Sequence, residues 1–441
     1  MRRQIPRPTD VNILINTVKS DGPGKRGRAA AGHLLRLCVT GIPVDTPLID
    51  GHLIDEHRAA GAQLAEYNGC VLPERYSDFD REYRAGKQTV ALFDTNWHAI
   101  LVLTGRDRVK YLHAISSNNI QALENGRGTL ALLLNPQGHI LAELEVYALP
   151  EKLLVLSHAA LRERTVATLK KYVIGSQVQI EDQTDRMGSM AVEGPRAMDV
   201  VAEIGSTHPV TGGSQFHRGS SGAKAPVLGQ SHVGAGSSDP LKTNDEMGSG
   251  GSIGDLPEMS VRETAVDGVP CFLLKRSHFG EPGAEIIAPR ENLVGLWRKL
   301  LTSVPAREGE PIGMAALNAL RLEAGVPWYP VDFNDAQIPH EAAIETTHIS
   351  FNKGCYTGQE IVERVRSRGH VNRKRVLMKF STPTAPAAGT KLHAAGAEVG
   401  YVTSAAFSPA TGTSIGMGYV RREQFASGSV VEFDGGTATV A

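Results

Sequence analysis

The sequence predicts an α+β fold and not a doubly wound parallel sheet. Strand-like runs follow one another as hairpins, most clearly at 128–149, where Pro136 can preset a turn and Gly138 can close it. Amphipathic helical patterns occur between such runs, but without the regular alternation of strand and helix that a parallel sheet requires. After about Arg375 the chain consists of short strands with Gly and Pro turns, which predicts a small antiparallel β-barrel or sandwich.

The individual elements follow from periodicity and composition. Apolar residues at helical spacing predict helices at 53–67, 105–123, 161–174, 291–304 and 313–327. Runs of β-branched and apolar residues predict strands on both sides of Asp94-Thr95-Asn96 within 89–105, in the hairpin at 128–149, at 152–158, and around the glycine-rich turn within 268–289.

Composition bounds the class of protein. The 441 residues are enough for two or three domains, and a net charge of −1 argues against binding nucleic acid through overall charge. The four cysteines (Cys38, Cys70, Cys271 and Cys355) form no CxxC or Cys/His ligand pattern, so neither a metal site nor a disulfide framework is predicted. No apolar run approaches the roughly 20 residues of a membrane span, and no signal peptide is recognisable. We therefore expect a cytoplasmic protein without membrane or direct nucleic-acid contact.

The chain divides into five stretches. Residues 1–47 are an unassigned extension, and 205–257 form a Gly/Ser-rich insert that we expect to be disordered, because it has too few apolar residues to offset its ordering entropy. Ordered patterns occupy 48–204 and 258–371, and the short-strand region covers 372–441.

The segment KGCYTGQE at 353–360, called here the signature segment, raises a question about Cys355. Lys353 and a following helix N-terminus would favour a reactive thiolate, and Gly354 and Gly358 allow tight turns. A cysteine that simply packs in a tight turn is equally compatible with the residues. Both interpretations stay open at this point.

Two further patterns carry weak functional signals. The basic run after the signature segment could hold an anionic tail or an RNA backbone, although a solvated surface is the commoner outcome; it comprises Arg364, Arg366, Arg368, His370, Arg373, Lys374 and Arg375. Glu281 and Glu285 flank the turn in HFGEPGAEIIAP, and one carboxylate there could accept two N–H bonds from a 2-amino-4-oxo pyrimidine edge.

Several of these stretches together resemble a known family. KGCYTGQE, LNPQGHILAELEVY, FGEPGAEIIAP, LRLEAGVPWYPVDFNDAQIPHEA and RGHVNRKR are similar, in the same order, to the YgfZ-type folate-binding proteins, relatives of the glycine cleavage T-protein (aminomethyltransferase). The resemblance runs from about Leu53 to the C-terminus, apart from the insert. It implies a T-protein-like (GcvT-like) arrangement of three domains around a central folate-sized hole, with 48–204 and 258–371 as the two parts of the folate-binding region and 372–441 as a β-barrel.

The resemblance also implies a function. It implies binding of tetrahydrofolate or a one-carbon derivative, and support for assembly or repair of iron–sulfur proteins, including an enzyme of tRNA modification. The expected partners are folate and iron–sulfur proteins or their assembly factors.

Site residues carry over one by one. Glu285 matches the carboxylate that grips the pterin, Asp332 belongs to the folate-binding loop, and Arg373 is a basic residue expected near the glutamate tail. Cys355 matches the signature cysteine and would be the redox or transfer thiol at the edge of the hole. The remaining signature positions are Lys353, Gly354, Tyr356, Gly358, Gln359 and Glu360.

Two departures from the T-protein pattern keep alternatives open. Ala142 and Glu143 stand where T-proteins carry paired aspartates, and Leu317 stands where they place a folate-contacting arginine. The missing aspartates, together with the cysteine signature that T-proteins lack, favour the YgfZ-type interpretation. The alternatives are a true aminomethyl- or methyltransferase, in which Glu143 replaces the missing aspartate, and a folate-free scaffold that docks a protein through its arginine run.

Overall fold

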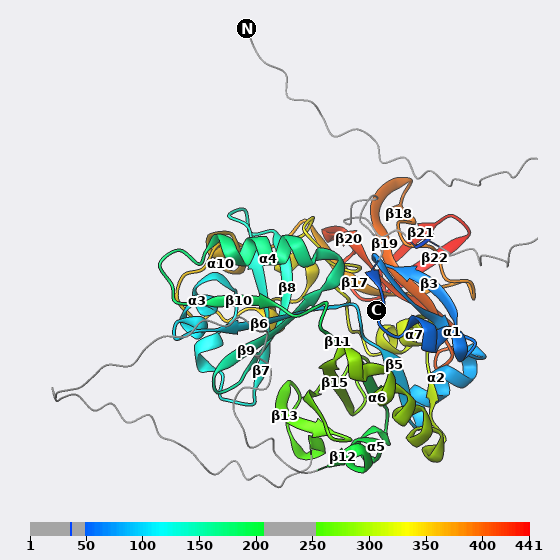
Figure 1. The fold of residues 1–441 in the computed structure, drawn as a ribbon. Helices are drawn as coiled ribbons and strands as arrows, with labels where there is room; N and C mark the ends of the chain where they lie inside the picture. The colour runs from blue at the N-terminus through cyan, green and yellow to red at the C-terminus, as the bar shows by residue number, and fades with distance from the viewer. Residues whose placement is uncertain (1–35, 38–48, 207–252) are drawn as a thin grey trace, which may run out of the picture. The chain divides into compact units, whose positions relative to one another are not determined.

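The structure is a computed structural model that describes residues 36–37, 49–206 and 253–441 (Figure 1). The expected extension at 1–47 lies almost wholly outside the described residues, and so does most of the expected disordered insert at 205–257. The ends of that insert are described as the short strand β12 (Gly205–Ser206) and the 3₁₀ turn η3 (Ile253–Asp255). All described residues belong to one compact unit.

The first sheet corrects the prediction of one helix over 53–67. Only α1 (Ile54–Ala59) is helical, and β3 (Gln63–Tyr67) pairs with β4 (Cys70–Arg75) as a hairpin. Asn68 and Gly69 connect them with φ angles of 50° and 83°. An Asn-Gly pair with two positive φ angles is the preferred two-residue hairpin turn, and this signal outweighs the helical spacing before it. The sheet also contains β1 (Arg36–Leu37) and β2 (Ile49–Asp50).

A five-stranded antiparallel sheet contains the predicted hairpin and its neighbours. Its strand order is β10 (Gln179–Asp182), β6 (His98–Thr104), β9 (Lys152–His158), β8 (Ile140–Ala148) and β7 (Gly128–Leu134). The helices α3 (Arg108–Ile115) and α4 (Arg162–Lys171) pack on it (Figure 1). On β8, Ala142, Leu144 and Val146 enter the apolar core beneath these helices. Because side chains alternate along a strand, Glu143 and Glu145 face the opposite side.

A seven-stranded sheet forms the second layer. Its strand order is β12, β13 (Ser260–Val266), β14 (Val269–Lys275), β15 (Gly283–Pro289), β11 (Met187–Glu193), β5 (Ala91–Asp94) and β16 (Glu310–Pro311). Four helices pack around it: α5 (Ala197–Ile204), α6 (Arg290–Ser303), α2 (Phe79–Gln88) and α7 (Met314–Glu323). The two strands predicted within 89–105 exist, but β5 and β6 belong to different sheets.

The C-terminal region is a closed six-stranded antiparallel barrel, which confirms the prediction of an α+β fold ending in a β-barrel. Its order is β17 (Arg373–Phe380), β20 (Thr413–Arg421), β19 (Ala397–Ser408), β18 (Lys391–Ala394), β21 (Val430–Phe433) and β22 (Gly436–Val440). Between α7 and the barrel lie α8 (Pro339–Ala342), α9 (Glu345–His348) and α10 (Gln359–Arg368). Within the described ranges, no helix combines the length and apolar character needed to cross a bilayer.

A buried polar joint connects α7 to the barrel. Arg321 of α7 and Asp332 are both fully buried and form an ion pair. The second oxygen of Asp332 accepts hydrogen bonds from the hydroxyls of Thr403 and Ser404 on β19, at 2.6 and 2.5 Å. Burial alone would raise the pKa of Asp332, but Arg321 and these hydroxyls lower it, so the carboxylate stays ionised.

Candidate functional site

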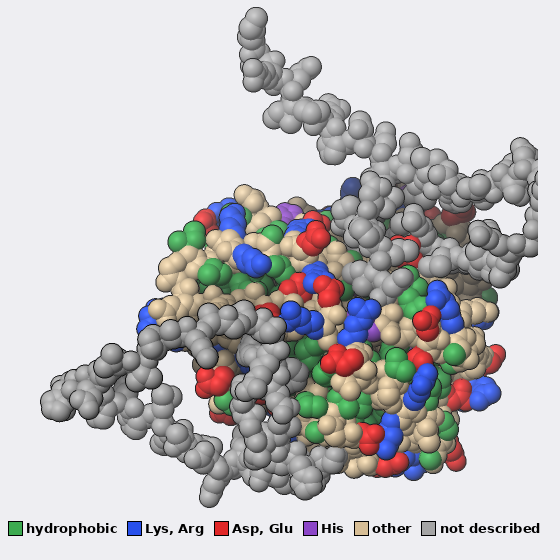
Figure 2. Space-filling model, viewed as in Figure 1, with side chains coloured by type: hydrophobic (Ala, Val, Ile, Leu, Met, Phe, Trp, Pro, Cys, Tyr) green, Lys and Arg blue, Asp and Glu red, His purple; other side chains and the backbone are tan. Residues whose placement is uncertain are grey.

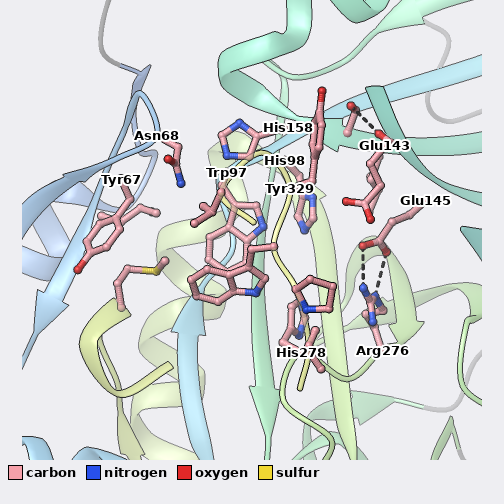
Figure 3. Close-up of a pocket in the computed structure, with 18 residues that line it drawn as sticks. Tyr67, Asn68, Trp97, His98, Glu143, Glu145, His158, Arg276, His278 and Tyr329 are labelled. Carbon is pink, nitrogen blue, oxygen red and sulfur yellow. Dashed lines mark hydrogen bonds and ion pairs between the residues drawn. The ribbon is translucent and has the colours of Figure 1, made fainter. Parts of the chain in front are cut away.

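The described chain contains a pocket between the β3–β4 hairpin, strands β6, β8 and β9, and residues 326–331 (Figure 3). About 810 Å³ of it is free of atoms, part of this being open to solvent. Tyr67 and Asn68 lie on one side, Glu143 and Glu145 lie on the other, and Trp97 lies between them (Figure 3).

Aromatic side chains form the apolar part of the pocket wall. Trp97 and Trp328 have ring centroids 6.3 Å apart, and Tyr67 and Tyr329 add two more rings to the lining. The guanidinium of Arg321 lies 4.5 Å from the centre of the Trp328 ring, which ties this wall to the buried joint with the barrel. Such a wall suits a flat heteroaromatic ligand, which can stack on ring faces.

A buried ion pair forms one charged part of the wall. The Glu145 carboxylate accepts two hydrogen bonds from Arg276, both 3.0 Å long (Figure 3). Burial alone would raise the pKa of Glu145, but the charge and hydrogen bonds of Arg276 outweigh it and lower the pKa to about 2. The pair is therefore ionised at neutral pH, and it presents a fixed, paired charge to the pocket.

Glu143 is the second carboxylate of the wall, and a hydrogen bond with a buried histidine fixes its position. The His348 Nε2 atom of α9 lies 2.8 Å from Glu143 Oε1, and His348 itself is buried. Ala142, its neighbour in the sequence, points into the core of the five-stranded sheet. Of the two residues that stand in place of the paired aspartates, only Glu143 reaches the pocket.

The floor of the pocket consists of His98 and His278, with Glu285 behind them. Glu285 is fully buried; its Oε1 accepts a hydrogen bond from the Thr95 hydroxyl (2.8 Å) and lies 3.4 Å from His98 Nε2. Its Oε2 lies 3.5 Å from His278 Nε2. Burial would lower the pKa of His278, but contacts with Glu193 and Glu285 outweigh it and raise the pKa to about 9.

The structure thus brings only part of the predicted cofactor site together. Glu285 reaches the pocket region but does not line it, because the two imidazoles lie between. Asp332 does not line it either, since its oxygens bind Arg321, Thr403 and Ser404. Arg373 is bound to Glu341 at 3.0 Å and to the Ala336 carbonyl. Asp332 and Arg373 are thus both bound to other groups of the protein, and their predicted role in binding folate stays a prediction.

The signature segment lies apart from the pocket lining and presents Cys355 to solvent. Its neighbour Lys353 is buried and does not serve the thiol as expected: its ammonium donates to the carbonyl oxygens of His113 and Ser116 at the end of α3. Tyr356 is buried with Tyr329 in one apolar cluster, and its hydroxyl has no hydrogen-bond partner. The packing interpretation therefore holds for Lys353 and Tyr356, but not for Cys355 itself or for Gly354, which are exposed.

Gly358 explains the tight approach between the signature segment and the β7–β8 turn. Its φ angle is 84°, and a Cβ atom there would meet the Asn135 carbonyl oxygen at 2.6 Å. Gly138 in that turn faces it, and a Cβ there would meet Ile361 at 2.9 Å. Gly354 has open space around it. One glycine of the segment is required by packing, and the other is not.

The basic run is largely paired within the chain. Arg364 binds Glu360 at 2.8 Å, Arg366 lies 3.5 Å from Glu363, and Arg375 is buried with its Nε donating to the Ala342 carbonyl. Over the face drawn in Figure 2, basic and acidic side chains are interspersed. These contacts favour the solvated-surface interpretation of the run over a free anion-binding patch.

Sequence reasoning missed most of the pocket. Trp97, His98, Glu145, Arg276 and His278 were not among the predicted site residues, although each lines it. The sequence contains two signals of these residues. Polar side chains interrupt an apolar run at Asp94-Thr95-Asn96, just before Trp97 and His98. Arg276-Ser277-His278 follows a second apolar run and precedes the turn that leads to Glu285. Neither signal says that these stretches meet.

Comparison with known proteins identifies the fold as a whole. The model for the GCVT N-terminal domain matches residues 53–218 and 246–353, and the model for the glycine cleavage T-protein C-terminal barrel domain matches 373–440. The chain belongs to the glycine cleavage T-protein family. Within this family, the matched residues include the whole lining of the pocket and the first residue of the signature segment.

Relatives with curated names are distant but span nearly the whole chain. A protein of Streptomyces coelicolor named aminomethyltransferase is 26% identical over 85% of this chain and 89% of its own length. One of Xanthomonas oryzae pv. oryzae with the same name is 26% identical over 82% and 86%. The crystal structure of the glycine cleavage system aminomethyltransferase T from Bartonella henselae superposes with a TM-score of 0.72 at 23% identity, covering 89% of this chain and 96% of that one.

Proposed function

We propose that this chain binds a tetrahydrofolate in the pocket and that it supports the assembly or repair of iron–sulfur proteins. The observation that carries the first half is the pocket itself: aromatic rings on one wall and two carboxylates on the other, in a member of the T-protein family. The named relatives are aminomethyltransferases, and proteins of this family use tetrahydrofolate. The second half rests on the resemblance of the signature segment.

The residues present fit a reduced folate. Trp97, Trp328 and Tyr329 offer ring faces for the pterin, and Glu143 offers a carboxylate, held by His348, to its N–H donors. When bound, the folate would supply one-carbon chemistry. The Glu145–Arg276 pair supplies a fixed dipole along the same wall. Glu285 would act on a pterin through His98 and His278, because these lie in front of it.

Anaerobic calorimetry with tetrahydrofolate tests the pocket. The wild type should bind, and Glu143→Gln should weaken binding by roughly 10-fold or more, since a carboxylate that accepts N–H bonds is replaced by a neutral amide. Glu163→Gln, an exposed change elsewhere, is the control and should bind like the wild type. Absence of binding to the wild type would overturn the folate assignment and favour a folate-free scaffold.

Cys355 carries the iron–sulfur half of the proposal. It is an exposed free thiol between two buried anchors, Lys353 and Tyr356, so its position is fixed while its sulfur stays accessible. In cells that rely on this gene, Cys355→Ser should lower the activity of an iron–sulfur enzyme at unchanged protein level. Asn352→Ser, an exposed neighbour, should not. Full activity in Cys355→Ser would remove the support for this role.

A second candidate is favoured by one observation. Glu143 reaches the pocket while held by His348 at 2.8 Å, the arrangement of a general acid or base with an orienting partner. Glu143 could therefore transfer a proton in an aminomethyltransferase reaction, although this chain lacks the paired aspartates. Turnover of an aminomethyl-lipoyl donor with tetrahydrofolate, lost in Glu143→Gln, would establish this activity; its absence in the wild type would exclude this candidate.

A further inference from the structure

Three buried side chains at the floor of the pocket point unpaired polar atoms toward one another. His98 Nε2, His278 Nε2 and Glu285 Oε2 have no hydrogen-bond partner, and all three residues are buried. Buried polar atoms without a hydrogen bond are uncommon, because the cost of removing them from water is then not compensated. Each imidazole lies within ion-pair distance of Glu285, but these three atoms make no hydrogen bond, so the space between them is a candidate site for a further group.

The spacing of these atoms fits a metal ion. His98 Nε2 lies 3.4 Å from Glu285 Oε1, and His278 Nε2 lies 3.5 Å from Glu285 Oε2. One ligand atom from each of the three residues can be chosen so that all lie within 4.8 Å of one another. Metal bonds of about 2.0–2.1 Å in tetrahedral geometry place neighbouring ligand atoms about 3.4 Å apart. The separations are thus too long for hydrogen bonds of good geometry but suit a shared ion.

Outer contacts orient the ligands as metal sites usually require. The Glu193 carboxylate lies 3.3 Å from His278 Nδ1 and directs the opposite nitrogen, Nε2, toward the cluster. Glu193 is itself held by the backbone N–H groups of His278 and Phe279, at 2.6 and 2.8 Å. The Thr95 hydroxyl donates to Glu285 Oε1. Carboxylate–histidine–metal relays of this kind fix the tautomer and the direction of a ligating imidazole.

We propose that His98, His278 and Glu285 bind one divalent first-row transition metal ion, of the Zn²⁺ or Fe²⁺ class, at the floor of the pocket. Two imidazoles and a carboxylate suit these ions, whereas Mg²⁺ and Ca²⁺ prefer oxygen ligands. Because only the neutral imidazole of His278 can coordinate, binding of the ion releases a proton from this side chain. Because both imidazoles line the pocket, the open coordination position faces it and can take water or a ligand group. This proposal does not depend on folate binding.

The sequence did not predict this site, because its ligands are far apart in the chain. His98 begins β6, His278 follows β14, and Glu285 lies on β15. Metal sites are recognisable from sequence when ligands recur at short spacing, and here the sheets bring them together only in the folded protein.

Metal-free protein, prepared with a chelator, tests the proposal without folate. Titration with Zn²⁺ against a chromophoric chelator, and with Fe²⁺ under anaerobic conditions, should give one site per chain. Binding should fall by at least about 10- to 100-fold in His98→Gln, His278→Gln and Glu285→Gln, as expected on loss of a ligand. His158→Gln is the matched control: it is a buried imidazole of the same pocket and the cross-strand partner of His98, but lies outside the cluster, so binding should persist.

Co²⁺ provides a readout that needs no variant. In the wild type, it should give the intense visible absorption of a four- or five-coordinate site, and Zn²⁺ should displace it. Only the weak absorption of six-coordinate Co²⁺, or one-to-one binding that survives in all three ligand variants, would overturn the proposal. If a ligand variant fails to fold by circular dichroism, Thr95→Val replaces it and should weaken Zn²⁺ binding through Glu285.

Discussion

At the residue scale, each carboxylate in or behind the pocket wall has a neighbour that is able to carry positive charge. Glu145 faces Arg276, Glu143 faces His348, and Glu285 faces two imidazoles. A buried charge without a partner is expensive, so each of these carboxylates lies beside a group that can stabilise it. Replacement of one partner should therefore affect stability as well as binding.

The ionised carboxylate of Glu145 should make the free energy of unfolding depend on pH, and Glu145→Gln should remove this dependence. Because the folded pKa of Glu145, about 2, lies below its ordinary value of 4.5, its ionised form contributes stability that is present above about pH 4.5. This contribution, about 3 kcal/mol, is lost as the pH falls from about 4.5 to about 2. The groups that face Glu145 are Arg276, His98 and His278, all able to carry positive charge, and the Tyr147 hydroxyl.

Urea unfolding at a series of pH values measures this effect. The free energy of unfolding of Glu145→Gln should be about 3–5 kcal/mol below that of the wild type at pH 7, because Arg276 is left unpaired. The gap should narrow steadily below about pH 4.5. A gap of constant size down to pH 2 would mean that Glu145 does not depend on Arg276 for its ionisation.

Two glycines of the signature segment should respond differently to alanine. Gly358→Ala should lower the free energy of unfolding by about 1–3 kcal/mol, because its φ angle is positive and a Cβ would clash with the Asn135 carbonyl oxygen. Gly354→Ala should change it by no more than about 0.5 kcal/mol, because nothing lies near the added atom. Chemical denaturation of both variants checks this; equal effects would contradict the described packing.

At the scale of elements, residues that lie close in the sequence are separated by the faces of a strand. On β8, Ala142 and Leu144 enter the core, while Glu143 and Glu145 enter the pocket wall. The same alternation explains why one hairpin contributes both to the core of its sheet and to the site. Its turn meets α10 through Gly138, so the hairpin also supports the signature segment.

The joint between α7 and the barrel is an element contact that can be tested by a pair of variants. Asp332→Asn should lower the free energy of unfolding by about 3–5 kcal/mol, because the fully buried Arg321 loses its counter-charge. Asp335→Asn, three residues along, breaks only an exposed ion pair with Arg164 and should change it by about 0–1 kcal/mol. Urea unfolding measures both, and a small effect of Asp332→Asn would show that the joint contributes little.

At the scale of the whole molecule, the pocket collects residues from distant parts of the chain. Its lining runs from Tyr67 in the β3–β4 hairpin, through Arg276 and His278 after β14, to Val331 beyond α7. A ligand that contacts all of these segments binds only when they are assembled. Its binding energy therefore adds to the stability of the folded state.

Tetrahydrofolate should raise the thermal unfolding midpoint, and above its dissociation constant the increase should follow the logarithm of its concentration. At 100 times its dissociation constant, a ligand specific to the folded state contributes about 2.7 kcal/mol. Anaerobic thermal shift assays should show this increase in the wild type and in Glu163→Gln, with a smaller shift in Glu143→Gln at the same concentration. Equal shifts in all three proteins would place the folate away from Glu143.

The sequence by itself determined the α+β class, the β7–β8 hairpin, the C-terminal barrel strands and the family resemblance. These features depend on local periodicity, turn residues and short motifs, which can be recognised in short stretches of the sequence. It did not separate α1 from β3, because helical spacing and the Asn68-Gly69 turn signal compete over the same stretch.

Only the tertiary structure decided which polar residues share a site. It turned Glu143 and not Ala142 to the pocket, placed His98 and His278 in front of Glu285, and gave Asp332 to Arg321 and the barrel. The physical reason is that strand alternation determines which residues share a face, but pairing between distant strands determines what that face meets.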